Sequence, residues 1–146
     1  MATGNSAKLY TPDVLALAVD LANYPLLGVF ECTAEARSST CGSTISLGLN
    51  IDPYGTVSKI GLSLSACAIG QASAALFARS VTGMSTEALI RQSAQIEAWL
   101  NGYENPPEIP SFDLIVPARS YPARRGALLL PWRAAQRALS NGLATG

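Results

Sequence analysis

Two runs of alternating residues, separated by the tetrapeptide DPYG, constrain the fold of this chain more than any other feature. An apolar residue at every second position is typical of a β-strand with one buried face. Pro53 in the second position of DPYG and Gly55 in the last position favour a tight turn between the runs. The sequence therefore predicts a β-hairpin over residues 43–64. The apolar positions of the two runs are Ile45, Leu47, Leu49, Ile51, Ile60, Leu62 and Leu64.

A lone hairpin is only marginally stable in water, so helices must cover its apolar face. Thr11 can cap a helix that starts at Pro12, and apolar residues follow at helical spacing until about residue 23. An alanine-rich run over residues 66–83 predicts a second helix, and two shorter helical patterns follow after Ser85 and around residues 96–100. Helical periodicity resumes over residues 112–142, where Pro131 either kinks the last helix or opens its second part.

The remaining segments complete one domain. LLGVFEC, residues 26–32, is rich in β-forming residues and predicts a third strand at the edge of the sheet. Residues 103–110 form a polar, proline-rich connector, and we expect residues 1–9 to be flexible. The prediction is a single α+β domain over residues 1–146, in which a three-stranded antiparallel sheet packs against several helices.

Charge and composition exclude several classes of function. Ten basic and ten acidic side chains among 146 residues give a formal net charge of zero, so binding to nucleic acid or to a membrane surface is not expected. The longest apolar stretch is interrupted by Asp20 and Pro25 and cannot cross a bilayer. The first residues have none of the features of a signal peptide, so we expect a cytoplasmic protein whose three cysteines are thiols.

Two of these cysteines flank the predicted hairpin. Cys41 precedes its first strand and Cys67 follows its second, so antiparallel pairing brings both to one end of the sheet. Cys67 also falls at the start of the alanine-rich helix, where unpaired N–H groups and the helix dipole favour a thiolate. A thiolate can bind a metal or accept sulfur, whereas the alternative is that these cysteines are buried packing residues. Nothing in the sequence places Cys32 beside the other two.

The chain offers little else for chemistry. It has no histidine to activate a serine or cysteine nucleophile, no C-x-x-C pair and no phosphate-binding glycine loop, so we do not expect an enzyme. Two thiolates are also too few to close a tetrahedral metal site. Further ligands would have to come from elsewhere in the chain, from a second copy, from a partner or from solvent.

The chain contains four segments with a recognisable pattern, namely YTPDVLALA, CGSTISLGLNIDPYGTVSKIGLSLSACAIGQASAALF, VTGMS and YPARRGALLLPWRAAQRAL. They resemble successive landmarks of the IscU/NifU/SufU-type family of iron–sulfur cluster assembly scaffolds, and the second cysteine motif is similar to that of the SufU-like branch. The resemblance runs from about Tyr10 to Leu139, which is nearly the whole chain.

The resemblance implies an IscU/SufU-like α+β fold and an activity. Such scaffolds accept sulfur as a persulfide from a cysteine desulfurase, combine it with iron, and pass the cluster to carriers or apo iron–sulfur proteins. Their ligands are three cysteines and an aspartate, and some members hold zinc at the same place. On this basis Cys41 and Cys67 correspond to the first and second cysteine ligands, with Cys32 as a further candidate.

The chain departs from the family pattern at two ligand positions. Ser43 stands where the family has its aspartate, and Ala127 stands where the third cysteine is expected. Arg125, near the latter position, could place positive charge beside the thiolates. These departures leave three alternatives open for the cofactor, namely a [2Fe–2S] cluster, zinc or none.

Two functions follow as expectations. In the first, the chain is a scaffold-like protein that handles an iron–sulfur cluster or persulfide sulfur on Cys41 and Cys67, and a homodimer would supply the four thiolates that a [2Fe–2S] cluster needs. In the alternative, it is a degenerate relative without a cluster that binds and regulates a cysteine desulfurase or a cluster-accepting partner.

Overall fold

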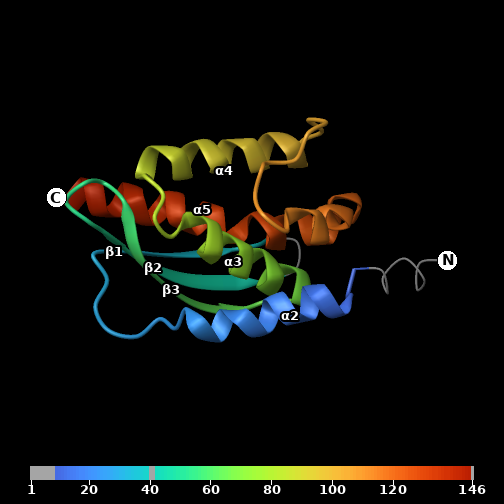
Figure 1. The fold of residues 1–146 in the computed structure, drawn as a ribbon, viewed down its shortest axis with the longest axis horizontal. Helices are drawn as coiled ribbons and strands as arrows, with labels where there is room; N and C mark the ends of the chain where they lie inside the picture. Colours follow the sequence, from blue (N-terminus) through green and yellow to red (C-terminus); the bar gives the residue numbers. More distant parts are fainter. Residues whose placement is uncertain (1–8, 40–41, 146) are drawn as a thin grey trace.

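A computed structural model describes residues 9–39 and 42–145, and the side chains of these residues up to Gly142 (Figure 1). It confirms the predicted α+β class with a three-stranded antiparallel sheet. Within the described residues, no helix is both long enough and apolar enough to cross a membrane. The elements in chain order are α2 (Pro12–Asp20), η1 (Leu21–Asn23), β1 (Cys32–Arg37), β2 (Thr44–Ile51), β3 (Val57–Ser65), α3 (Ala68–Val81), α4 (Thr86–Leu100), η2 (Phe112–Leu114), η3 (Val116–Ser120) and α5 (Pro122–Thr145).

The sheet has the strand order β1-β2-β3, and its register explains why one face is buried. In the hairpin, Leu47 lies opposite Leu62, and the neighbouring apolar pairs fall on the same face. The DPYG turn is closed by Asp52, whose Oδ1 accepts hydrogen bonds from the N–H of Tyr54 at 2.9 Å and of Thr56 at 3.0 Å. The predicted hairpin is therefore confirmed.

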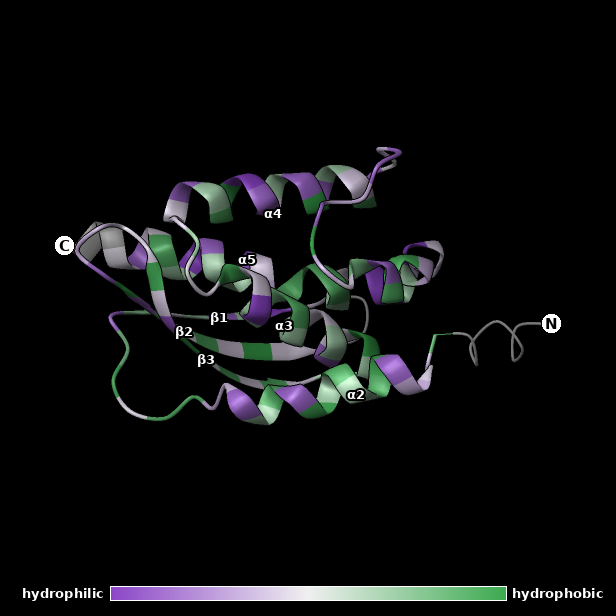
Figure 2. Cartoon of the chain, viewed as in Figure 1, coloured by the Kyte–Doolittle hydropathy of each residue, from purple (hydrophilic) through white to green (hydrophobic). Residues whose placement is uncertain are grey.

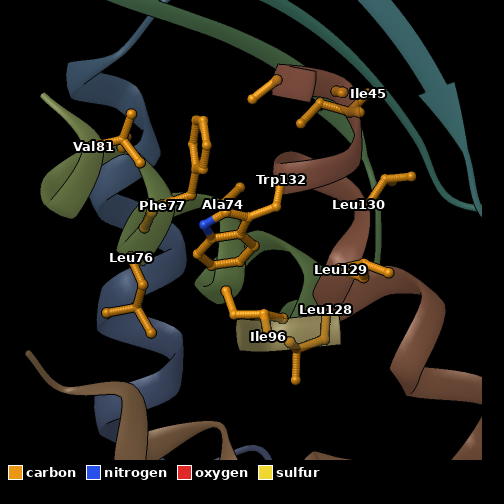
Figure 3. Close-up of a cluster of buried hydrophobic side chains, with 14 of the residues drawn as sticks. Ile45, Ala74, Leu76, Phe77, Val81, Ile96, Leu128, Leu129, Leu130 and Trp132 are labelled. Atoms are coloured by element: carbon orange, nitrogen blue, oxygen red, sulfur yellow. The ribbon is translucent and has the colours of Figure 1, made fainter. Parts of the chain in front are cut away.

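A layer of helices covers the apolar face (Figure 1). α5 lies across β1 and β2, α3 packs beside α5, and α2 packs on α3. Between α3 and α5, the rings of Phe77 and Trp132 meet edge to face with their centroids 5.4 Å apart (Figure 3). The Nε1–H of Trp132 donates to Gln92 Oε1 at 2.8 Å, which ties α4 to this core. Hydrophilic residues recur along α4 where it does not face α5 (Figure 2).

α2 and α3 run in the same direction. Thr11 caps α2 as predicted, because its Oγ1 accepts the N–H of Val14 at 3.2 Å. At the other end, Arg79 Nε of α3 lies 2.7 Å from Asp20 Oδ2 of α2. Both helices therefore start at the same side of the molecule (Figure 1). Of the residues expected to be flexible, only Leu9 is described, and it is buried with 3% of its surface exposed.

The prediction of a strand over residues 26–32 is wrong except at its last residue. β1 starts at Cys32, and residues 26–31 cross the polar face of the sheet instead. There the ring of Phe30 covers Gly48 and Gly61, and Lys59 Nζ lies 5.0 Å from the ring centroid. The alternation that forms β1 rests on Cys32, Ala34 and Ala36, whose small side chains give a weak strand signal.

One helix prediction also needs correction, and one of the two alternatives for Pro131 is excluded. The patterns after Ser85 and around residues 96–100 belong to a single helix, α4. Pro131 does not open a separate helix, since α5 is continuous from Pro122 to Thr145. A proline inside a helix removes one backbone hydrogen bond, and α5 is held here by its contacts with α3 and the sheet.

Gly61 provides a test of how the crossing segment packs. A Cβ at this position would lie 2.5 Å from Phe30 Cζ and 3.0 Å from Leu26 Cα, so Gly61→Ala should lower the free energy of unfolding by about 1–3 kcal/mol through overpacking. Urea denaturation measures this. In a Phe30→Ala background the same substitution should cost clearly less, and an equal cost in both backgrounds would show that Phe30 does not lie over Gly61.

A candidate functional site at one end of the sheet

Several segments meet at the end of the sheet where β2 begins and β3 ends. Thr44 lies opposite both Arg37 of β1 and Ser65 of β3. Ser43 and Gly42 precede Thr44, while Ala66 and Cys67 follow Ser65, so both chain segments leave the hairpin at this end. We call this region the Cys67 rim and define it as residues 42–44 and 65–67 together with the starts of α2, α3 and α5.

Cys67 occupies the N-cap of α3 in an extended backbone conformation, with φ −66° and ψ 170°. It is a free, partly exposed thiol. Its carbonyl accepts the N–H of Gln71 at 3.0 Å, and the side chain of Gln71 donates back to the carbonyl of Ala66 at 2.9 Å. The side chain of Cys67 itself makes no capping hydrogen bond. The thiol therefore sits at the start of a 14-residue helix, where unpaired backbone N–H groups attract negative charge.

The N-caps of α2 and α4 differ from this choice of residue. α2 is capped by Thr11, and α4 is capped by Ser85, whose Oγ accepts the N–H of Ala88 at 3.1 Å. Serine, threonine, aspartate and asparagine stabilise this position because their oxygen accepts a backbone N–H. A cysteine at the start of α3 forgoes that hydrogen bond, so helix stability does not explain its presence.

Cys41 lies outside the described residues, but Gly42 and Ser43, which follow it, are described. The N–H of Gly42 donates to the carbonyl of Ser38 at 3.1 Å, and the N–H of Ser38 donates to the carbonyl of Ser43 at 2.8 Å. Gly42 has a φ of 73°, which a glycine adopts without strain. These bonds tie Ser38 to Gly42 and Ser43 at the Cys67 rim, and Ser43 is buried there with 5% of its surface exposed.

Cys32 does not join Cys67. It lies opposite Leu49, five positions along β2 from Thr44, which corresponds to about 17 Å at about 3.4 Å per residue. Its Sγ packs against Gly142 near the end of α5, where no added Cβ would fit. Burial, with a smaller contribution from the charge of Glu31, raises the pKa of Cys32 above its ordinary value. It is a buried thiol on the core side of the sheet.

Ala127 lies close to the start of α3, at a buried contact between the helices. Its exposed fraction is 0%. A Cβ added at Gly70, one helical turn after Cys67, would lie 3.4 Å from the Cβ of Ala127 and 2.8 Å from that of Ala66. In the next turn, Ser73 Oγ donates to the carbonyl of Leu128 at 2.6 Å. The structure thus brings Cys67, Ser43 and Ala127 to one end of the fold, but the last of these contributes only a methyl group.

The arginines near the rim have separate roles. Arg125 Nε donates to the carbonyl of Arg119 at 2.7 Å, so its side chain is directed towards η3. Arg119 in turn donates to the carbonyls of Trp99 and Tyr103 at 3.2 and 2.9 Å and lies 5.1 Å from the centre of the Trp99 ring. The sequence did not single out Arg37, because the strand that carries it was predicted too early in the chain.

Two cavities formed by the described residues are not lined by Cys67. One of about 660 Å³ lies between α4 and the connector, beside Tyr103 and Pro106. Another, of about 500 Å³, is lined by Arg37, Thr44 and Arg137 at the β1 side of the rim. Among the described residues, no group of three or more Cys, Asp or Glu side chains is placed to hold a metal ion.

The fold has known counterparts among solved structures. The crystal structure of the N-terminal part of a nitrogen-fixing NifU-like protein from Brucella abortus matches with a TM-score of 0.87 and 25% sequence identity, over 97% of this chain and 99% of that one. A candidate iron–sulfur cluster assembly scaffold protein for the SUF system from Fervidobacterium islandicum matches with a TM-score of 0.78 and 20% identity, over 90% and 96% of the two chains. No protein-family model and no curated protein matches the sequence.

These matches confirm the resemblance that the sequence indicated. The chain has the fold of the IscU/NifU/SufU-type scaffolds, and the match extends over almost all of its length. The arrangement of three antiparallel strands under a layer of helices is therefore complete in this chain.

Substituting the N-cap of α3 tests whether Cys67 is present for stability. Cys67→Ser supplies a hydroxyl that can accept an N–H of the first turn, so we expect the free energy of unfolding to rise by about 0.5–1 kcal/mol. Thermal or urea denaturation measures the change, with Cys67→Ala as the matched control without an acceptor. A serine variant less stable than the alanine variant would show that the thiol already serves as a cap or packing group.

The raised pKa of Cys32 predicts a pH dependence of stability. Above about pH 9 the cysteine of the unfolded chain ionises while the buried thiol stays protonated, so the unfolded state binds fewer protons and stability falls as the pH rises. Cys32→Ala should flatten this decline relative to the unsubstituted protein. Denaturation at a series of pH values between neutrality and pH 10 gives the two slopes, and parallel slopes would contradict the assignment.

Proposed function

We propose that this chain is an iron–sulfur cluster assembly scaffold-like protein that accepts sulfur as a persulfide on Cys67, with Cys41 as the second candidate cysteine. The observation that carries the proposal is the free, partly exposed cysteine at the N-cap of α3, a position where it contributes no capping bond. The fold of a NifU-like protein and of a candidate SUF scaffold supports the same class of function.

Sulfur transfer requires only one accessible thiolate from the protein. The Cys67 thiolate attacks the terminal sulfur of a persulfide carried by a cysteine desulfurase. A new S–S bond forms at Cys67 while the S–S bond on the donor breaks, and the donor cysteine leaves as a thiolate. The terminal sulfur keeps its proton, so no external oxidant or reductant takes part.

The rim supplies two conditions for this transfer, and the surrounding compartment supplies a third. The N–H groups at the start of α3 attract negative charge on the attacking sulfur. Partial exposure lets a donor reach Cys67, whereas Cys32 is buried at the other end of the sheet. The thiol must also stay reduced between transfers, as thiols do in the cytosol. The partners in this proposal are a cysteine desulfurase as donor and carriers or apo iron–sulfur proteins as acceptors.

Sulfur uptake can be read directly by mass spectrometry. After incubation with a cysteine desulfurase and free cysteine, we expect the intact protein to gain the mass of one sulfur atom, lost again on treatment with a thiol reductant. Cys67→Ser should abolish this gain, and Cys32→Ser should leave it unchanged because Cys32 is buried. Peptide mapping then assigns the persulfide.

A variant that lacks both rim cysteines distinguishes sulfur transfer from the second candidate function, in which the protein binds and regulates the desulfurase. Ser43 and Ala127, which cannot act as soft ligands, favour this alternative. A Cys41→Ser/Cys67→Ser variant that takes up no sulfur yet still changes desulfurase turnover would support regulation. Persulfide formation on Cys32, or on no cysteine of the unsubstituted protein, would contradict sulfur transfer at the rim.

A further inference from the structure

We infer that the Cys67 rim holds no metal ion within a single chain, because Ser43 and Ala127 fill two ligand positions with groups that pack and do not coordinate. This inference rests on the proposed function for the nature of the cargo, which would then be sulfur alone. Its test needs no desulfurase, so the two ideas can fail separately.

The number of metal-binding side chains in the sequence limits how many ligands the rim can provide. The chain has three cysteines and no histidine. Cys32 lies opposite Leu49, five positions along β2 from the rim, so its sulfur cannot join a site at Cys67. At most two thiolates per chain remain for the rim, and a closed tetrahedral site uses four protein ligands.

Ala127 is built into the contact between α3 and α5. Its side chain is fully buried, and the absence of a side chain at Gly70 lets Ala127 and Ala66 approach the same point of α3. The bond from Ser73 Oγ to the Leu128 carbonyl and the Phe77–Trp132 ring contact extend the same interface. The methyl group of Ala127 therefore serves the packing of two helices one turn from Cys67.

Ser43 is likewise part of the structure of the rim. Its carbonyl accepts the N–H of Ser38, and its side chain is almost fully buried. A serine hydroxyl is neutral and is a poor ligand for zinc or iron compared with a thiolate or a carboxylate. Position 43 therefore lies at the rim, but its side chain is not a suitable metal ligand.

Supplying the missing donors should create the site. We expect Ser43→Asp/Ala127→Cys to add a carboxylate and a thiolate to the thiolate of Cys67, which gives the rim three protein ligands and leaves a fourth position for a further ligand or solvent. The purified reduced protein is incubated with Zn²⁺ or Co²⁺ and desalted. Bound metal is then measured by elemental analysis, and cobalt–thiolate charge-transfer absorption reports the ligands. The double variant should retain about one ion per chain, against a small fraction of one for the unsubstituted protein.

Two matched variants make the result specific. Ser43→Asn/Ala127→Ser has nearly the same shapes without an anionic donor and should retain no more metal than the unsubstituted protein. Cys67→Ser in the background of the double variant should remove the charge-transfer absorption. Circular dichroism establishes that each variant is folded.

Metal retention by the unsubstituted protein tests the inference even if the double variant does not fold. Retention of about one ion per chain that is lost in Cys67→Ser would overturn the inference. A folded Ser43→Asp/Ala127→Cys protein that gains no metal would overturn it as well, because the two positions would then not be what limits binding.

Discussion

The antiparallel pairing of β2 with β3 is the interaction on which the rest of the structure depends. Its register puts Ile45, Leu47 and Leu49 on the face that the helices cover. The same register sets Thr44 opposite Ser65 and so fixes where the chain enters and leaves the hairpin. A shift of one residue would turn the apolar side chains to the other face, so the burial of the core and the position of the rim are specified together.

The start of α3 connects this sheet to the chemistry. The helix begins at Ala68, soon after β3 ends at Ser65, so the end of the strand determines where the N–H groups of the first turn lie. Small residues on α3 then let α5 approach closely, as at Gly70 and Ala127. The contact that buries the two helices against each other therefore includes Ala127, where the family resemblance implies a third ligand.

The sequence predicted the parts of the molecule in which a local pattern and the tertiary structure agree. The hairpin followed from strict alternation around DPYG, and the start of α2 followed from Thr11 and Pro12. It failed for β1, because alanines at 34 and 36 give little strand signal and Phe30, which looks like a strand residue, instead covers two glycines. The distance of Cys32 from the rim depends on that misplaced strand, so it could not be foreseen either.

Ala127 and Cys67 lie at the same end of the fold, but stability accounts for only one of them. Ala127 is what packing alone favours, since an unpaired thiolate buried between two helices would be costly. Cys67 is not what packing or capping favours, because a hydroxyl or carboxylate at the same N-cap would satisfy a backbone N–H that the thiol leaves without a side-chain acceptor. A metal site would need both positions to give up stability. The proposed sulfur transfer needs only Cys67 to do so.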